Sequence, residues 1–425
     1  MIPTLLAAVR LIRDDLARVL EPAALRDLCR SLGLRWRRRL LDPIATIHLF
    51  LLQILHGNTA CSHLPRLAGR RFTASAYCQA RARLPLAVLH GLLRRIAETL
   101  RPVVDAEGLW HGHRTWLLDG TGVGLPDTPP LQRAFGQPTN QAAGCGFPVA
   151  RVLALFHAGT GLLQSFRAAP LRSHEMARAA ALHPELRPGD VLVGDRAFGT
   201  FAHLYLLVSR GLHGVFRMSQ RRVVDFTPGR LPPPRWNTRE LSGKARSRWV
   251  RTLGPTDQVV GWYKPYQRPA WMSAEEYARL PVTLAVRETR YEVNRPGFRV
   301  RTVTLVSTLL DADAYPAEEL AGLYRRRWRV ETDLKHLKTT LGMDVLHCQA
   351  EEGVLKELAA FALVYNLVRV VMLEAARRQG VPASRISFVD ALRWLASAAP
   401  GTPLPRLVVN PRRKGRVEPR CRGWS

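Results

Sequence analysis

The first quarter of the chain carries hydrophobic residues at the three- and four-residue spacing of an amphipathic α-helix. One stripe ends before Pro22, and another begins at Leu25. Residues 57–84 combine short helical patterns with Gly, Ser and Thr and resemble a helix-turn-helix. We therefore predict that residues 1–105 are helical. The first stripe consists of Leu5, Leu6, Val9, Ile12, Leu16 and Val19.

From residue 115 the apolar runs become as short as β-strands and are bounded by turn residues. Helical patterns at His174–Leu182 and Phe201–Ser209 separate the later runs. Strands that come first and then alternate with helices predict a mixed α/β sheet. The predicted strands are Thr115–Asp119, Val149–Phe156, Leu162–Arg167, Val191–Asp195 and Gly214–Met218.

Residues 219–300 differ in composition, because Pro, Arg and Trp become frequent there. β-like stretches at Trp249–Leu253 and Val259–Tyr263 predict a β-rich insertion, and Thr302–Leu309 predicts a strand that returns to the main sheet. We interpret each tryptophan of the insertion as a packing residue. These tryptophans are Trp236, Trp249, Trp262 and Trp271.

Two helices are predicted after the returning strand, one from Pro316 past Lys338 and one over Val354–Ala376. Residues 399–425 are rich in Pro and Arg, and we expect this tail to be flexible unless it binds nucleic acid. Its basic residues include Arg412, Arg413, Lys414, Arg416, Arg420 and Arg422.

Charge narrows the classes of function. The 425 residues include 63 Lys and Arg against 34 Asp and Glu, which gives a net charge of +29 and favours nucleic acid as partner. Two basic clusters in the helical segment are candidates for DNA contact, with a solvated helix face as the alternative. The clusters are Arg35, Arg37, Arg38 and Arg39, then Arg66, Arg70, Arg71, Arg81 and Arg83.

Other classes are disfavoured. The six cysteines form no CxxC pair, which predicts reduced thiols in a cytosolic protein. No signal peptide or membrane span is predicted, since the longest apolar stretch, Ile44–Leu55, is too short. The chain has no P-loop and no GxSxG motif, which disfavours nucleotide use and serine hydrolysis.

Three carboxylates are candidates for chemistry. Asp119 and Asp195 each follow an apolar strand, in WLLDG and VLVGD, where the strand end places a side chain at the sheet rim. Each alone is also compatible with a turn. On a continuous helix, Glu331 shares a stripe about 60° wide with Tyr324, Arg327 and Lys338. A salt-bridged helix face is the alternative interpretation of this stripe; the remaining acid of the segment is Asp333, on the far side.

The combination fits metal-dependent phosphodiester cleavage. Two Mg²⁺ ions about 3.5–4 Å apart can activate the nucleophile and stabilise the leaving oxygen. Such hard cations take oxygen ligands, which Asp and Glu supply. Arg, Lys and Tyr beside the carboxylate would hold phosphate oxygens.

The spacing Y-x2-R-x3-E-x6-K, formed by Tyr324, Arg327, Glu331 and Lys338, resembles the signature of DDE-type insertion-sequence transposases of the IS-four family. LLDGTG and VLVGDRAF around the two aspartates, SAYCQARARLP, LKTTLGMDVLHC and ELAAFALVYNLVR are also similar to that family. The resemblance extends from about residue 57 to residue 370.

The resemblance implies an RNase H-like core in which Asp119, Asp195 and Glu331 bind Mg²⁺, while Tyr324, Arg327 and Lys338 contact transposon-end DNA. Relatives that cut through a DNA hairpin stack an aromatic residue on a flipped base, but the strand TVTLVSTLL lacks the expected tryptophan. The expected domains are a helical DNA-binding domain (1–105), the core (106–218 and 301–375), the insertion (219–300), and a C-terminal helix with basic tail (376–425).

We therefore expect a bacterial cytoplasmic transposase, nucleoid-associated when bound to DNA, that cleaves its inverted-repeat ends and joins them to target DNA. Two Mg²⁺ ions are expected, and Mn²⁺ can substitute. The expected partners are double-stranded DNA and a second copy of the chain, with no membrane and no nucleotide cofactor. The alternatives are a metal-dependent nuclease without strand transfer and a catalytically silent DNA-binding repressor.

Overall fold

The computed structural model of the chain describes residues 2–37, 39–139, 142, 144–231, 245–293 and 302–409. It divides into two compact units, each built from several segments of the sequence. Unit 1 comprises Met1–Glu107, Gly120–Arg172 and Glu331–Arg413. Unit 2 comprises Gly108–Asp119, Ser173–Val330 and Lys414–Ser425. The fold is a mixed α/β structure with a helical N-terminal region, as the hydrophobic pattern predicts.

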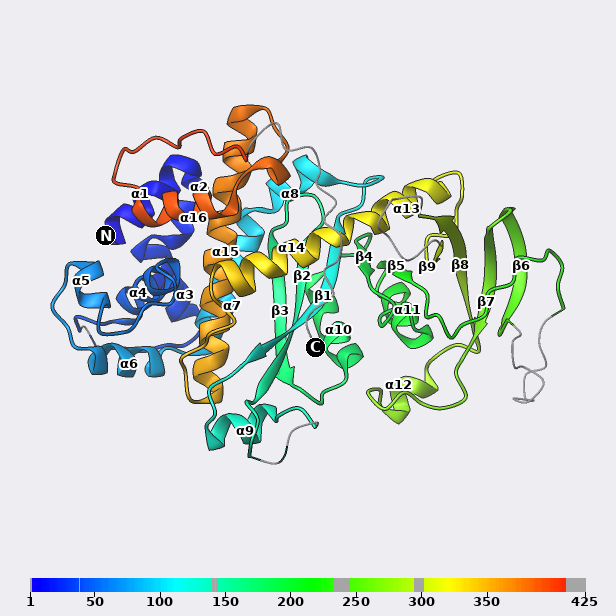
Figure 1. Cartoon of the computed structure of the whole chain (residues 1–425), viewed down its shortest axis with the longest axis horizontal. Helices are drawn as coiled ribbons and strands as arrows, with labels where there is room; N and C mark the ends of the chain where they lie inside the picture. The colour runs from blue at the N-terminus through cyan, green and yellow to red at the C-terminus, as the bar shows by residue number, and fades with distance from the viewer. Residues whose placement is uncertain are drawn as a thin grey trace. The chain divides into compact units, whose positions relative to one another are not determined.

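Unit 1 begins with a series of short helices, coloured blue to cyan in Figure 1. α4 is apolar on nearly all sides and is therefore buried, and the Asp42 carboxylate caps it by accepting the Ala45 N–H at 2.8 Å. The helices are α1 (Ile2–Ile12), α2 (Asp14–Leu20), α3 (Pro22–Ser31), α4 (Pro43–Leu55), α5 (Leu64–Ala68), α6 (Ala74–Arg83), α7 (Leu86–Thr99) and α8 (Arg101–Gly108).

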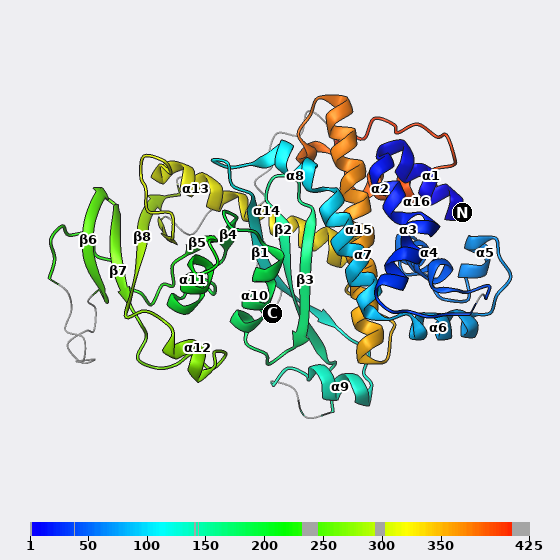
Figure 2. The ribbon, with the colours of Figure 1, turned by 180° about the vertical axis from the view of Figure 1, so that it is seen from behind.

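The long helix α15 (Glu351–Gln379) is the core helix of unit 1. Its length and a mean hydropathy of 1.7 over its most apolar window would allow it to cross a membrane, but 94% of that window is buried inside the protein. α4 and α7 pack against it, and Figure 2 shows α7 and α15 running side by side. Burial within the fold explains why this helix is hydrophobic on every side.

A β-hairpin completes the core of unit 1. β2 (Val149–His157) pairs antiparallel with β3 (Leu163–Pro170), and β3 packs on both α7 and α15. The second half of β1 (Thr115–Gly124) belongs to the same unit, where Gly122 lies against Val149. The remaining elements are α9 (Pro129–Phe135), η2 (His336–Thr340), η3 (Ala383–Arg385) and α16 (Phe388–Ser397).

Unit 2 is built on a mixed sheet in the order β1-β4-β5-β9-β8-β7-β6. β1, β4 and β5 are parallel, and the following strands are antiparallel. The strands are β4 (Val191–Gly194), β5 (His213–Arg217), β6 (Ser247–Gly254), β7 (Asp257–Tyr263), β8 (Thr283–Glu292) and β9 (Thr302–Ser307). The helices are α10 (Glu175–Leu182), η1 (His183–Glu185), α11 (Phe201–Val208), α12 (Ala274–Ala278) and α13 (Ala317–Arg326).

The insertion strands extend the main sheet instead of forming a separate one. β9 returns between β5 and β8, as predicted, and β6 to β8 continue the sheet from there. Trp262 is only 1% exposed, and its indole N–H donates to Glu288 at 2.8 Å, which confirms it as a packing residue. Trp236 and the run Pro232–Pro234 lie outside the described residues, as do residues 410–425 of the basic tail.

Two predicted boundaries are wrong. β1 does not end at Asp119 but continues to Gly124; only its pairing with the short β4 stops there. The helix predicted from Pro316 past Lys338 is also not continuous. It is interrupted at Arg327, resumes as α14 (Trp328–Lys335), and widens into the π-helical turn η2. A π-turn changes the angular spacing, so the single stripe expected on a regular helix does not extend to Lys338.

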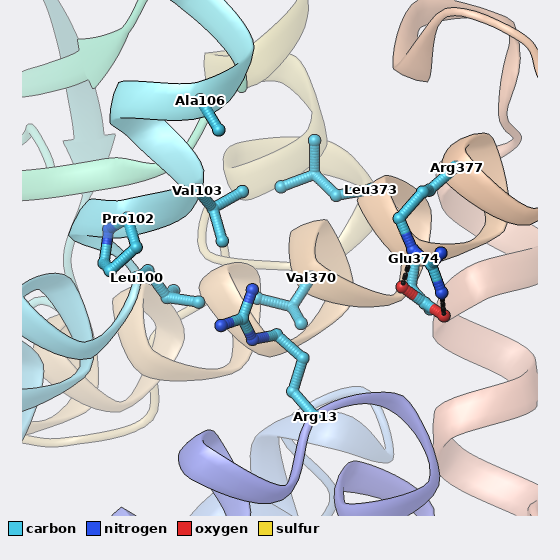
Figure 3. Close-up of a pocket in the computed structure, with 9 residues that line it drawn as sticks. All are labelled: Arg13, Leu100, Pro102, Val103, Ala106, Val370, Leu373, Glu374 and Arg377. Atoms are coloured by element: carbon cyan, nitrogen blue, oxygen red, sulfur yellow. Dashed lines mark hydrogen bonds and ion pairs between the residues drawn. The ribbon is translucent and has the colours of Figure 1, made fainter.

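A pocket of about 280 Å³ lies in unit 1, beside α8 and α15 (Figure 3). Its floor is apolar, and Arg13, Glu374 and Arg377 line its rim, where Arg377 and Glu374 form an ion pair at 2.7 Å. No residue predicted to act in catalysis or DNA contact lines it. This pocket is therefore separate from the candidate chemistry.

Two buried histidines connect η1 and α11 in unit 2. The Nε2 atoms of His183 and His203 are 2.9 Å apart, and His203 Nδ1 lies 2.8 Å from the Phe198 carbonyl. Because His203 donates through Nδ1, its Nε2 accepts the N–H of His183. Burial lowers the pKa of His183 to about 3 and that of His203 to about 4.

These histidines predict acid sensitivity of the fold. In the unfolded chain both rings bind a proton below pH 6.5, whereas in the folded protein they stay neutral until about pH 4. Their contribution to stability is therefore complete above pH 6.5 and is lost as the pH falls toward 4. We expect the pair to cost about 2 kcal/mol per histidine at pH 5 relative to pH 8. Thermal melting across this range measures the loss.

The control is the variant His183→Leu with His203→Leu. It should show a clearly shallower dependence of melting temperature on pH between 6.5 and 4 than the parent. The same slope in both proteins would mean that other groups set the acid sensitivity.

Candidate active site

Asp119 and Asp195 lie side by side at the same edge of the unit 2 sheet. The parallel register pairs Leu118 of β1 with Gly194 of β4, and each aspartate is the next residue along its strand. The hydrophobic runs before them are fully buried, so each chain leaves the core at its carboxylate. The predicted meeting of these two acids at one sheet edge is therefore what the structure shows.

The residues around Asp195 hold it in place. Gly194 is required because the rings of Phe198 and Phe216 lie against it, and a Cβ there would come within 2.8 Å of Phe198. After β4 the chain turns at once, and the Asp195 Oδ1 accepts the Ala197 N–H at 2.6 Å. This turn keeps the second carboxylate oxygen directed away from the Ala197 amide.

Asp119 faces Arg327 of the Y-R-E-K signature. Arg327 Nη1 is 3.6 Å from Asp119 Oδ2, and the two side chains are only 11% and 22% exposed. The guanidinium also lies 5.1 Å from the ring centre of Trp328 and 5.8 Å from that of Tyr324. The interruption of the helix at Arg327 thus places this cation beside the first carboxylate, between two aromatic rings.

Tyr324 is the buried member of the signature, with 5% of its surface exposed. Burial raises the pKa of its phenol, and the charges that act on it include Arg327, Arg217 and Asp195. Tyr324 therefore stays protonated at neutral pH and can donate a hydrogen bond. Its position links the signature helix α13 to the strand ends that carry the aspartates.

Arg217 is a site residue that the sequence analysis missed. Gly194 of β4 pairs with Phe216 of β5, so Arg217 follows the same row of the sheet as Asp119 and Asp195. It also acts on the phenol of Tyr291, whose pKa burial raises to about 12. The signal in the sequence was an arginine directly after the apolar run Gly214-Val-Phe, at the end of a predicted strand.

Glu331 and Lys338 belong to unit 1, whereas the other signature residues belong to unit 2. Glu331 is exposed in the first turn of α14, and Lys338 is half-buried in η2. Asp333 is 5% exposed on the opposite face of α14, as predicted. Over the described part of the chain, no group of three or more His, Cys, Asp or Glu side chains is assembled to hold a metal ion.

The two carboxylates at the sheet edge nevertheless suit a divalent cation. Both are oxygen donors, both are partly accessible, and their neighbours Arg217 and Arg327 are cations that phosphate oxygens can share. Glu331 offers a third oxygen donor on an exposed helical turn. Such a donor set matches Mg²⁺ or Mn²⁺ better than a metal that requires sulfur or imidazole.

The basic clusters of the helical region are exposed with one exception. Arg66, Arg70, Arg71 and Arg83 face solvent, whereas Arg81 is 9% exposed. Arg81 donates to Gln53 Oε1 at 3.0 Å and lies 2.8 Å from Cys348 Sγ, above the ring of Phe50. The expectation that Arg81 contacts DNA is therefore wrong, because its guanidinium is used inside the core.

A family model described as a transposase DDE domain matches residues 110–367. The chain belongs to the DDE transposase family. This transposase is 24% identical to "Transposase InsG for insertion sequence element IS4" from Escherichia coli (strain K12), over 80% of this chain and 77% of InsG. The resemblance to the IS-four family based on the signature spacing is thereby confirmed.

A solved structure of the piggyBac transposase synaptic complex with hairpin DNA covers 87% of this chain and 74% of its own. Its TM-score of 0.41 and identity of 11% are too low to support a conclusion. Family membership itself sets the reaction class. This transposase is a DNA-binding enzyme of metal-dependent DNA cleavage and strand transfer.

Arg217 provides a test of this site. Arg217→Gln removes one cation from the row of strand ends while keeping a polar side chain, so we expect cleavage to slow by about tenfold or more. The matched control is Arg248→Gln on the exposed face of β6. Single-turnover cleavage and melting temperature would be measured for both. Equal cleavage rates in the two variants would remove Arg217 from the site.

Proposed function

We infer that the enzyme is an insertion-sequence transposase that cuts the inverted-repeat ends of its own element and joins the freed 3′ ends to target DNA. The observation that carries this inference is the pairing of Arg327, from the signature, with Asp119 at the sheet edge. It connects two motifs that lie more than two hundred residues apart in the sequence.

Asp119, Asp195 and Glu331 are the proposed ligands of two Mg²⁺ ions, for which Mn²⁺ can substitute. The first two follow neighbouring parallel strands. Glu331 follows Arg327 by four residues, about one helical turn or 6 Å along the helix axis. This arrangement supports the RNase H-like core that the resemblance implies, with β1 and β4 as its acid-bearing strands.

Bound divalent cations supply acidification of water and neutralisation of charge at the scissile phosphate. The residues of the chain orient the DNA around them. Arg327 and Arg217 place guanidinium groups beside the carboxylates, where they can hold phosphate oxygens. Tyr324 keeps its proton and donates a hydrogen bond, and Lys338 adds a further cation to the signature.

Strand transfer then needs no nucleotide cofactor. The 3′-hydroxyl attacks a target phosphorus, a new P–O bond forms, and the target P–O3′ bond breaks. One phosphodiester replaces another, so the reaction needs no external energy source. Two ends must react together, and we therefore propose a homodimer in the synaptic complex, acting in the bacterial cytoplasm at the nucleoid.

The helical segment 1–105 is the proposed DNA-binding domain. Residues 43–97 contain seven arginines and no acid. α6 packs Tyr77 against the core formed with α4 and α5, so its other face is exposed. That face lacks acids and large apolar residues, which suits entry into a DNA groove. It consists of Ser75, Cys78, Gln79, Ala82 and Arg83.

Product mapping tests the proposal against its alternatives. The protein is incubated with its flanking inverted repeats and Mg²⁺, and the 3′ and 5′ ends are mapped. We expect cuts at the element ends and joined products in target DNA. Cuts without joining would indicate a nuclease, and binding without cuts would indicate a repressor.

The matched variant is Asp119→Asn, which keeps the size of the side chain but removes its charge. Metal-dependent cleavage should disappear, since the ligand set loses one anion. End binding, measured by mobility shift, should persist. Full cleavage activity in this variant would exclude Asp119 from the site.

Arg327→Ala and Lys338→Ala test the proposed contacts with DNA. Each should weaken end binding and reduce the slope of log K against log salt by about 0.9, the value for one lost phosphate contact. Titrations at several salt concentrations measure the slope. An unchanged slope would show that these side chains do not touch phosphate. Arg378→Ala is the control, because Arg378 is engaged by Glu374 on α15.

A further inference from the structure

The motif YNLVR, residues 365–369 of α15, is not explained by the chemistry above, although it is part of the family resemblance. Three of its side chains are polar and buried: Tyr365, Asn366 and Arg369 are 0%, 1% and 7% exposed. Burying a polar side chain is costly unless a partner satisfies it. Their partners therefore show what the motif does.

Two of these side chains hold the turn between β2 and β3. The Tyr365 hydroxyl donates to the Gly161 carbonyl at 2.9 Å. Asn366 forms two bonds with the backbone of Leu163, one to the N–H and one to the carbonyl, each at 2.8 Å. The turn is thus attached to α15 by directional bonds in addition to apolar packing.

The third, Arg369, connects this turn to the signature helix. Its guanidinium donates to the Thr160 carbonyl and lies 3.6 Å from Asp333 of α14. Both charged side chains are almost completely buried, at 9% and 7% exposure. Burial and the nearby Asp333 carboxylate raise the pKa of Tyr365 well above its usual value, so that phenol remains a donor.

Gly161 provides the space for Arg369. Its φ is +69°, and a Cβ there would lie 2.2 Å from Arg369 Nη2. Any other residue would be strained in this conformation and would displace the guanidinium. The turn is therefore shaped to accept the arginine.

A second contact holds the same helix one turn later. The ring of His336, in η2, stacks on Phe388 with centroids 4.3 Å apart, and Phe388 stacks on Tyr365 at 5.8 Å. Burial lowers the pKa of His336 to about 4, so the ring is uncharged at neutral pH. Tyr365 and Arg369 thus support α14 and η2 at two successive points.

We propose that Asp333, Tyr365 and Arg369 form a positioning anchor that fixes the rotation of α14 about its axis, and thereby the direction of Glu331 and Lys338. Asp333 lies two residues after Glu331, about 200° around the helix, so holding one face inward directs the other outward. The inference rests on the proposed function for the role of Glu331 as a metal ligand. Arg369 itself touches neither metal nor DNA in this assignment.

The direct test is hydrogen exchange of the metal-free protein. In Arg369→Gln, amides of residues 328–340 should exchange about tenfold faster or more, because α14 loses its buried partner. Exchange in α6, on the same unit, should not change. The matched control is Arg377→Gln, the same substitution at a solvent-exposed ion pair of α15. Unchanged exchange in residues 328–340 would overturn the anchor.

The functional test is the Mn²⁺ concentration that gives half-maximal cleavage. Residues that orient a ligand typically alter metal affinity 10- to 100-fold, and we expect a rise in this range for Arg369→Gln. DNA-end binding should change little. A lowered melting temperature without any change in the metal requirement would leave Arg369 as a purely structural residue and would overturn the inference.

Two further variants keep the test decisive. If Arg369→Gln does not fold, Asp333→Asn keeps the shape of the anchor and should produce the same rise in exchange and metal requirement. The double variant Asp333→Asn with Arg369→Gln removes both buried charges and should recover part of the loss. Glu331→Gln separates the two hypotheses. If it still cleaves, the proposed ligand is wrong; if it does not, an unchanged metal requirement in the anchor variants sinks the anchor alone.

Discussion

The parallel pairing of β1, β4 and β5 is the constraint on which the site depends. Its register puts Leu118, Gly194 and Phe216 in one row, so the next residue on each strand is Asp119, Asp195 or Arg217. Backbone hydrogen bonds of a buried sheet hold this row far more firmly than contacts between side chains could. Two carboxylates and a cation are therefore brought together before any ligand contributes.

Much of this arrangement could be predicted from the sequence. The apolar runs before Asp119 and Asp195 predict buried strands, and strands that end in an acid predict a site at the rim. The helical region, the strands of the core, and the strands β6 and β7 follow from the same periodicity. The signature spacing predicted the family, which the match over residues 110–367 confirms.

The rest depends on interactions between distant segments, which local periodicity does not contain. Arg81 and Arg83 are equally basic in sequence, yet only Arg81 is buried, because Gln53 and Cys348 come to it from other parts of the chain. β8 was not predicted because its polar residues include Arg287, which is completely buried in a pair with Asp257. The break at Arg327 and the ligation by all three acids likewise could not be derived from a regular helical repeat.

The π-turn at the end of the signature helix means that the spacing between Glu331 and Lys338 is counted in turns as well as in residues. A wide turn accommodates one residue more than the regular helix would. Deleting a single residue within His336–Thr340 could be absorbed by closing the bulge into ordinary helix, with the chain beyond it still in reach of α15. A deletion of the same size in α14 has no such reserve, and would rotate everything after it by about 100°. The segment that looks irregular is thus the one place along this helix where the length of the gene can drift without loss of alignment.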